Sequence, residues 1–253
     1  MTRTRTIALA LLVVAAVAVG GFVAYDQVLR GDSVAALALP SASPSSDAGN
    51  APTLAPVSSD PSAGATDPSS DGTLAGEWIV GAGSVAGYRV REQLANLPAE
   101  SDAVGRTEDV SGSITVEGDG DGAQLTAGTL TVDTTTIQSD EGRRDNRLRN
   151  EGLQTDQFPT ATFTVTQPVE VPAAALAGAP TDLTLIGDLT LHGVTKSVEI
   201  PAQAQLTDGK IQVAGSLTFP LSDFGIDPPN VGGFILSISD EGALEFLVSF
   251  EKA

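Results

Sequence analysis

The chain has 253 residues, no cysteine, one histidine and a formal net charge of −19. The lack of cysteine excludes disulfides, thiolate zinc sites, iron–sulfur clusters and haem attached through cysteine, and a single histidine excludes a multi-histidine metal cage. A surface so negative repels phosphate backbones, which argues against nucleic acid binding. We therefore expect no metal, no cofactor and no nucleic acid partner.

The amino-terminal segment contains an uncharged apolar run at residues 7–25. As a helix it spans roughly 28 Å, which matches the hydrocarbon core of a bilayer. Arg3 and Arg5 precede the run and Asp26 follows it, so the positive-inside bias places the rest of the chain outside the cytoplasm. We predict a signal anchor over residues 1–30 and a single-pass protein of the cell membrane. Ala36-Leu37-Ala38 resembles a signal cleavage site but lies well beyond the run, and secretion after cleavage stays the alternative.

Residues 31–75 are predicted to be a disordered linker. Residues 40–75 consist almost entirely of Ser, Pro, Ala, Gly, Asp and Thr, which bury too little apolar surface to offset the entropy of ordering. As a flexible coil this stretch has an end-to-end distance of roughly 30 to 36 Å. The remaining residues, 76–253, are long enough for one domain, and they contain 10 basic and 26 acidic residues.

From residue 76 onward the chain follows a two-residue period, with apolar side chains in one phase and polar side chains in the other. The clearest segments are residues 109–117, 160–166, 182–191, 197–206, 210–219 and 244–250. Such segments, separated by Gly, Asp and Pro, predict an antiparallel barrel or sandwich. Residues 140–153 are charged and free of proline, and they predict one or two short helical turns capped by Asp140. Residues 171–180 are an Ala-rich insertion that we expect to form a helical turn or a loop.

Several motifs occur together in one order along the domain. They are Trp78, Ser84 and Tyr88-Arg89-Val90; Arg144-Asp145, Leu148-Arg149, Phe158-Pro159 and Phe163; the segment GDLTLHGVTK at residues 187–196; and SDFGI at residues 222–226. In these motifs the chain resembles the YceI-like family over roughly residues 76–253. The resemblance implies a lipocalin-like antiparallel β-barrel with a small helical element, whose interior accommodates a long apolar ligand such as a polyisoprenoid or a related lipid. It also implies a secreted or periplasmic location.

The sequence departs from the family at two points. Arg91-Glu92-Gln93 follows Val90, where the family often has a histidine. Residues 151–157 also lack the aromatic residue that commonly accompanies the Phe-Pro motif.

A barrel of about eight strands is wide enough to be filled by its own side chains or to hold one slender ligand. Gly112, Gly187 and Gly215 interrupt the apolar faces, and they either leave space in the interior or mark bends. We predict that the ligand contacts the following residues: Tyr88, Val90, Leu130, Val132, Phe163, Val165, Leu189, Leu191 and Phe224.

Four arginines, Arg143, Arg144, Arg147 and Arg149, form a basic cluster in the acidic domain. Guanidinium groups suit phosphate and carboxylate oxygens, so Arg144 and Arg147 are candidates for contact with a ligand head group. The alternative is a purely structural role, in which the cluster pairs with its neighbours Asp140, Glu141, Asp145 and Glu151.

No catalytic residue is predicted. His192 precedes Gly193 at an apparent tight turn, and no Gly-x-Ser-x-Gly motif supplies a nucleophile for it, so we interpret it as a turn residue. The acidic segment at residues 117–122 resembles a calcium loop, but Gly128 stands where the bidentate Glu is required, so we expect a hairpin turn.

Two functions follow from these observations. The first is a membrane-anchored carrier or binding protein for a polyisoprenoid, an isoprenoid quinone or a related lipid. The second is a surface interaction or stress-response module with a packed barrel and no ligand. The sequence does not suggest an enzyme, and it leaves a homodimer open.

Overall fold

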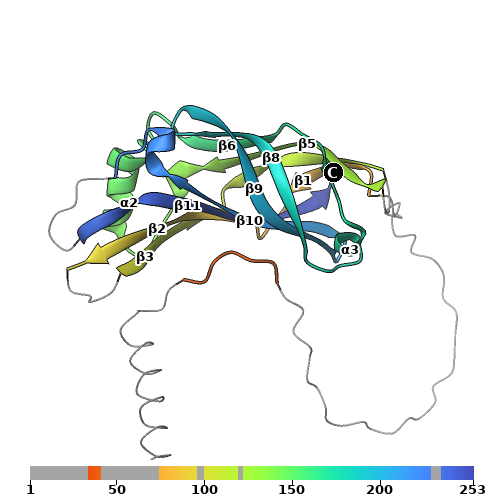
Figure 1. Ribbon diagram of the computed structural model, residues 1–253, viewed down its shortest axis with the longest axis horizontal. Coiled ribbons are helices and arrows are strands. Elements are labelled where there is room, and N and C mark those ends of the chain that lie inside the picture. The colour runs from red at the N-terminus through yellow and green to blue at the C-terminus, as the bar shows by residue number, and fades with distance from the viewer. Residues whose placement is uncertain (1–33, 41–73, 96–99, 119–121, 229–234) are drawn as a thin grey trace, which may run out of the picture.

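The computed structural model describes residues 34–40, 74–95, 100–118, 122–228 and 235–253 (Figure 1). These residues form one sheet in which every strand pairing is antiparallel. Its strands are β1 (Gly76–Val80), β2 (Val85–Leu94), β3 (Glu100–Thr107), β4 (Val110–Glu117), β5 (Gln124–Asp133), β6 (Thr160–Val165), β7 (Val169–Glu170), β8 (Thr181–Leu191), β9 (Val194–Thr207), β10 (Lys210–Pro220) and β11 (Ile235–Lys252).

The sheet closes into a barrel because β1 pairs with β4 on one side and with β11 on the other. Trp78 lies opposite Ile114 of β4 and Lys252 of β11. Three positions around the barrel are each shared by two strands placed end to end: β1 with β2, β3 with β4, and β6 with β7. The eleven strands of the described residues therefore occupy eight positions, and the predicted all-β antiparallel barrel is confirmed.

The two-residue period explains which side chains face inward. In β8, Leu185, Leu189 and Leu191 are buried, whereas Thr184 and Asp188, which are in the opposite phase, are exposed. A strand with this pattern buries its apolar side only in the observed register, because a shift by one residue would turn every leucine outward. The six segments predicted from alternation coincide with β4, β6, β8, β9, β10 and β11.

Two tight hairpins connect β8, β9 and β10. His192 and Gly193 link β8 to β9, and Asp208 and Gly209 link β9 to β10; all four residues have positive φ, between 51° and 73°. Two consecutive positive φ values are typical of a type I′ turn, whose twist matches that of the flanking strands. The structure therefore places His192 at a turn, as predicted.

One end of the barrel is covered by a helical segment instead of a strand. After β5 the chain turns through η2 (Thr134–Thr136). Gln138 then forms a single antiparallel bridge with Arg106 of β3. Next come α2 (Gly142–Arg147) and the π-helical turn η3 (Leu148–Gly152), at the positions predicted to be helical. The cap differs from the prediction: the Glu141 carboxylate, not Asp140, accepts a hydrogen bond from the backbone N–H of Arg143 (3.2 Å).

The described residues contain two further short helices, α3 and η4. α3 (Ala173–Leu176) lies within the Ala-rich insertion, so this insertion forms a helical turn. η4 (Leu221–Phe224) follows β10 and buries Leu221 and Phe224.

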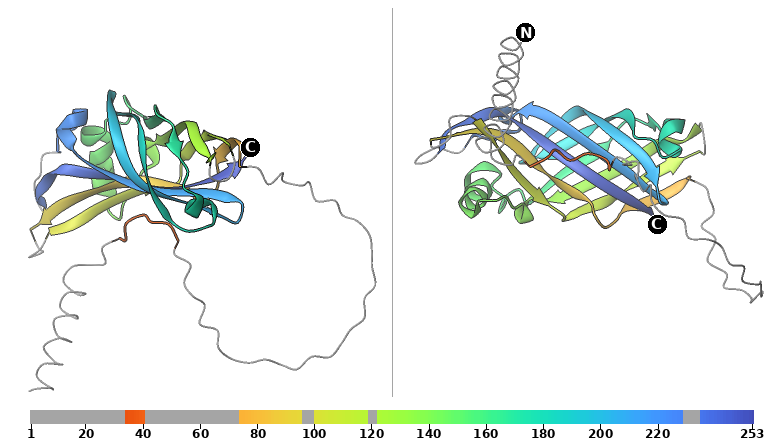
Figure 2. Two further views of the ribbon diagram at one scale, coloured as in Figure 1. Left: turned by 45° about the vertical axis from the view of Figure 1, so that its right-hand side comes forward. Right: turned by 90° about the horizontal axis from the view of Figure 1, so that it is seen from below.

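Residues 34–40, which we call the strap, lie across the outer face of the barrel (Figure 2, right). Arg89 of β2 donates a hydrogen bond to the backbone carbonyl of Val34 (2.9 Å), and Arg106 of β3 donates one to that of Ala35. Leu39 is only 6% exposed. Part of the segment predicted to be a disordered linker therefore has a defined place against the barrel.

The predicted signal anchor and most of the predicted linker lie outside the described residues. Within the described residues, no helix has the length and apolar character needed to cross a bilayer.

The barrel cavity as a candidate binding site

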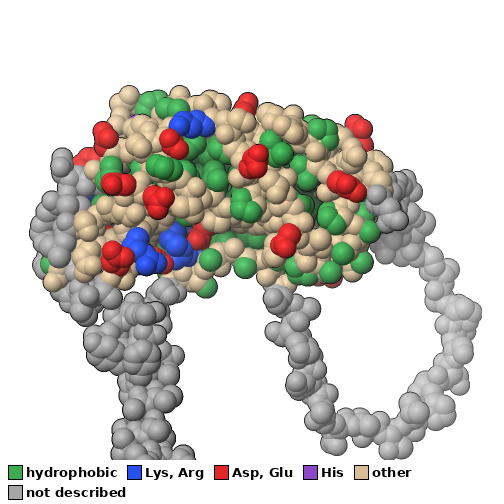
Figure 3. All heavy atoms as spheres, viewed as in Figure 1, with side chains coloured by type: hydrophobic (Ala, Val, Ile, Leu, Met, Phe, Trp, Pro, Cys, Tyr) green, Lys and Arg blue, Asp and Glu red, His purple; other side chains and the backbone are tan. Residues whose placement is uncertain are grey.

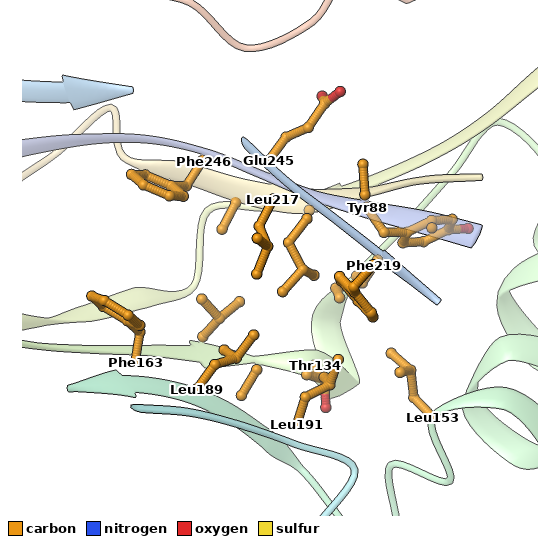
Figure 4. A pocket seen from close by; sticks show the side chains of 18 of the residues that line it. Tyr88, Thr134, Leu153, Phe163, Leu189, Leu191, Leu217, Phe219, Glu245 and Phe246 are labelled. Carbon is orange, nitrogen blue, oxygen red and sulfur yellow. The ribbon is translucent and has the colours of Figure 1, made fainter. Parts of the chain in front are cut away.

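The interior of the barrel contains a cavity of about 660 Å³. This volume lies in the range of small-molecule sites, which is roughly 300 to 1,000 Å³. Figure 4 shows Phe163 and Phe246 on one side of the cavity and Tyr88 and Leu153 on the other, with Thr134, Leu189, Leu191 and Leu217 between them. The side chain of Glu245 points away from the cavity, so its carboxylate belongs to the outer face.

Eight of the nine predicted contact residues line this cavity. They are Tyr88, Val90, Leu130, Val132, Phe163, Val165, Leu189 and Leu191. All eight are on strands, at positions whose side chains face inward. Their contact with a ligand stays a prediction.

Phe224 does not line the cavity, and its predicted place was wrong. It belongs to η4 and is 1% exposed, with its ring packed edge-on against Phe219 at a centroid distance of 5.0 Å. Phe219 is the residue of this pair that faces the cavity. Phe224 thus supports the wall from behind, because the chain leaves the sheet at the end of β10.

Aromatic rings cover three glycines of the wall, Gly105, Gly187 and Gly215. A Cβ atom on Gly215 would lie 2.5 Å from the ring of Phe246, one on Gly187 would lie 2.6 Å from the ring of Phe163, and one on Gly105 would lie 2.3 Å from the ring of Tyr88. These glycines let the rings lie close to the backbone of the wall, which leaves the centre of the barrel open. A Cβ atom on Gly187 would also lie 2.3 Å from the backbone oxygen of Thr164, and one on Gly112 would lie 2.0 Å from that of Thr129, so at these two positions the neighbouring strand itself leaves no room.

The end of the cavity beside α2 is polar. Glu92 of β2 is 3% exposed and accepts a hydrogen bond from Arg144 Nη2 at 2.7 Å, while Arg144 Nη1 pairs with Asp140. Burial disfavours the charge on Arg144, but Glu92 and Asp140 outweigh this effect and raise its pKa above the usual value. Burial raises the pKa of the nearby Tyr88 phenol to about 12.

Glu92 was not predicted as a site residue. Glu92 alternates in step with Tyr88 and Val90 along β2, so its side chain faces inward with theirs. This alternation was the feature of the sequence that could have identified Glu92. Where the family often has a histidine after Val90, this chain makes a polar contact through the carboxylate of Glu92.

The other acidic neighbours of the arginine cluster have different roles. Arg147 lines the cavity and lies 3.9 Å from Glu151, and both side chains are substantially exposed. Asp145 instead accepts hydrogen bonds from the backbone N–H and the hydroxyl of Ser139 (3.0 and 2.6 Å). The structural pairing predicted for the cluster thus holds for Asp140 and Glu151 but not for Asp145, nor for Glu141, whose carboxylate accepts from the backbone N–H of Arg143 and from no guanidinium among the described residues.

His192 lies outside the lining of the cavity. Its Nδ1 is 3.1 Å from the backbone oxygen of Phe224, and its ring packs edge-on against Phe158 at 4.6 Å. These contacts attach the β8–β9 turn to η4.

Comparison with known proteins gives consistent results. The model of the YceI-like domain matches residues 80–250. A UPF0312 protein of Shewanella putrefaciens is 37% identical over 133 residues, which is 49% of this chain and 63% of the relative, so the match spans less than two thirds of that protein. The YceI protein of Escherichia coli is 37% identical over 75 residues, or 29% of this chain and 35% of that protein.

A solved structure shares the fold. It is a polyisoprenoid binding domain from Saccharophagus degradans implicated in plant cell wall breakdown, with a TM-score of 0.53 and 20% sequence identity over 71% of this chain and 99% of that one. The family model covers most of the chain and the barrel agrees with it, so the chain belongs to the YceI-like family.

Proposed function

We propose that this protein is an extracytoplasmic, membrane-anchored carrier that holds a long apolar ligand, such as a polyisoprenoid, an isoprenoid quinone or a related lipid, in the barrel. The observation that carries the proposal is the apolar cavity of about 660 Å³ inside the barrel. The polyisoprenoid binding domain from Saccharophagus degradans, which shares the fold, supports the choice of ligand class.

The driving force is the removal of apolar surface from water. At about 25 cal/mol per Å², a chain that hides several hundred Å² gains on the order of 10 kcal/mol, which offsets the loss of translational, rotational and conformational freedom on binding. The wall supplies the matching surface through Phe163, Leu189, Leu217 and Phe246. The proposal requires no catalytic group.

The membrane attachment rests on the sequence alone. Residues 7–25 are long and apolar enough to anchor the chain, and the charge bias around them favours export of the barrel. An anchored barrel could exchange lipid with the bilayer that holds it.

The alternative function was an interaction module with a packed barrel and no ligand. It requires side chains to fill the interior, and the cavity does not support it.

The test is uptake of a polyprenol by the full chain in detergent, measured by native mass spectrometry after the micelle is removed. We expect one bound polyprenol in the wild type. Leu217→Trp should abolish uptake because the larger side chain fills the cavity, whereas Ser216→Trp, next to it on the exposed side of β10, should leave uptake intact. Circular dichroism verifies that both variants fold. Wild-type protein that takes up no polyprenol or quinone would contradict the proposal.

A further inference from the structure

The strap joins the barrel near the end that α2 covers, which we call the α2 end. Arg89 of β2 donates a hydrogen bond to the carbonyl of Val34 (2.9 Å). Three residues further along β2, Glu92 pairs with Arg144 of α2 at 2.7 Å. Since a strand rises about 3.3 Å per residue, the start of the strap is roughly 10 Å along β2 from the place where α2 is attached.

The strap then runs toward the opposite end of the barrel, which we call the α3 end (Figure 1). Leu37 borders a groove together with Leu183 of β8, and β8 begins shortly after α3. The chain also returns to the barrel there. The carbonyl of Leu74 accepts a hydrogen bond from Trp78 (2.9 Å), and Leu74 packs against the same buried cluster as Leu176 of α3.

Both ends of the stretch at residues 41–73 therefore meet the barrel toward its α3 end. While the strap is in place, only residues 26–33 separate the barrel from the apolar run. A fully extended chain spans at most about 3.6 Å per residue, so Val34 stays within about 32 Å of Tyr25. If the strap detaches, the first attached residue is Leu74, and this limit rises to about 180 Å. The strap therefore sets the length of the tether.

The cavity reaches the surface at the α2 end. Asp140, Glu141 and Arg143 line the cavity and are exposed. The α3 end is closed by the buried cluster that contains Trp78 and Ala123. The open end of the cavity is thus the end at which the strap joins the barrel.

Electrostatic attraction does not bring the barrel to a bilayer. Residues 76–253 contain 10 basic and 26 acidic residues. On the face seen in Figure 3, acidic side chains are spread over the surface and basic ones are few. Anionic lipid headgroups repel such a surface, so the barrel depends on its attachment to stay close to the membrane.

We infer that the strap is a releasable clamp that holds the α2 end of the cavity at the bilayer from which the ligand is loaded. The strap is not part of the sheet, so it can detach while the strand pairing stays intact. Its release lengthens the tether and lets the loaded barrel move away from the bilayer. The inference rests on the proposed function, because it assigns where the membrane-anchored carrier takes up its ligand.

The first test measures which end of the barrel lies nearer the bilayer. The chain has no cysteine, so Asn146→Cys on α2 or Ala174→Cys on α3, both at exposed positions, provides a single site for a donor fluorophore. The full chain is placed in phosphatidylcholine nanodiscs that contain a lipid with an acceptor on its headgroup. We expect stronger energy transfer from α2 than from α3.

Two matched variants test the role of the strap. Leu37→Asp/Leu39→Asp places two charges in the contact between the strap and the barrel and should detach the strap. The chain then joins the barrel at Leu74, so the excess transfer from α2 should be lost. Ala36→Asp/Ala38→Asp adds the same charges at exposed positions of the strap and should keep the excess. Circular dichroism verifies that both variants fold.

The second test measures loading from the bilayer. A polyprenol that carries a diazirine is included in the nanodiscs, and its crosslinks to barrel peptides are counted by mass spectrometry at successive times. The effective concentration of a tethered group falls roughly as the −3/2 power of tether length, and release lengthens the tether about fivefold, so Leu37→Asp/Leu39→Asp should load about tenfold more slowly. In detergent, where no bilayer has to be reached, this variant and the wild type should take up the polyprenol equally.

Equal transfer from the two labels in the wild type would overturn the inference alone. An excess that survives in Leu37→Asp/Leu39→Asp, or an unchanged loading rate in that variant, would do the same. A full chain that does not stay with the nanodiscs would overturn the membrane attachment and this inference with it. No uptake in detergent, with the excess transfer in place, would contradict the carrier function and still support the position of the strap.

Discussion

The barrel wall carries an arginine–carboxylate cluster on each face of β2, and the two clusters differ in whether they border the cavity. On the outer face, Arg89 bonds Glu245 through Nε (2.6 Å), Asp102 through Nη1 (3.0 Å) and the carbonyl of Val34 in the strap through Nη2 (2.9 Å). On the inner face, Arg144 bonds Glu92 and Asp140, and its Nε is buried without a hydrogen-bond partner among the described residues.

Arg89 thus satisfies all three of its nitrogens with groups of the protein, but Nε of its neighbour Arg106 is buried without a hydrogen-bond partner among the described residues. Each cluster therefore contains one unsatisfied arginine Nε, and the two differ in their surroundings: the inner cluster borders the cavity, whereas the carboxylate of Glu245 points away from it. We expect the outer cluster to act as a structural clamp and the inner cluster to tolerate more change, because the cavity beside it has room for water. The predictions below test this difference.

The largest effect is expected for Arg89→Met. The variant leaves Glu245, which is 5% exposed, with Arg106 at 3.7 Å as its remaining ion-pair partner among the described residues. Removing one member of a buried pair is strongly destabilising, and we expect a loss of about 3 kcal/mol in the free energy of unfolding. Urea unfolding of the full chain, followed by the fluorescence of the buried Trp78, measures it. Arg91→Met, which removes a side chain that is 60% exposed, is the control and should cost less than about 0.5 kcal/mol.

Arg144→Met should cost less, about 1 to 2 kcal/mol. Glu92 loses its partner, but water in the adjacent cavity can hydrate the carboxylate, whereas Glu245 is covered by its neighbours. The same unfolding experiment applies, with Arg147→Met as the control because Arg147 is 38% exposed and its ion pair is long. If Arg144→Met proved as costly as Arg89→Met, the two clusters would be equally rigid and the comparison would fail.

The fold and the cavity differ in how far the sequence predicts them. The strict alternation of apolar and polar residues predicted β8, β9 and β10. In a closed barrel a shift of the register by one residue would turn the apolar side chains outward, so the alternation allows one register. β3 escaped detection: its inward positions, Ala103, Gly105 and Thr107, are small, so the alternation in hydrophobicity is lost. The apolar wall of the cavity was predictable from the same phase.

The polar contacts were less predictable. Glu92 and Arg144 are 52 residues apart, and their pairing depends on α2 lying over the open end of the barrel, which no local pattern encodes. The strap was missed for a similar reason. Residues 34–40 do not alternate, and their contacts depend on Arg89 and Arg106 from two strands far along the chain.

The pH dependence of stability sharpens the description of the inner face. Burial raises the pKa of Tyr88 from 10.0 to about 12, so the folded protein holds this proton more tightly than the unfolded chain does. The stabilisation is fully present below about pH 10 and is lost as the pH rises toward 12, by up to about 2 kcal/mol. Tyr88→Phe should abolish this part of the loss in urea unfolding, whereas Tyr25→Phe should not. Parallel loss of stability in the wild type and in Tyr88→Phe would show that the phenol is not protected by burial.

The smallest effect concerns the strap, which covers the outer cluster. Leu39→Ser places a hydroxyl group in the contact between the strap and the barrel, where the leucine is 94% buried. Detachment of the strap leaves the pairing of the barrel strands intact, because the strap is not part of the sheet. A loss of about 1.4 kcal/mol in this local contact raises the open fraction about tenfold, and proteolysis follows the open fraction when opening is fast. Limited proteolysis should therefore cut within residues 34–40 about ten times faster, while the unfolding free energy reported by Trp78 stays nearly constant. Ala36→Ser, at an exposed position of the strap, is the control. Equal cleavage of Leu39→Ser and the wild type would mean that attachment of the strap to the barrel does not depend on Leu39. The burial of Leu39 would then not help to hold the strap over the outer cluster.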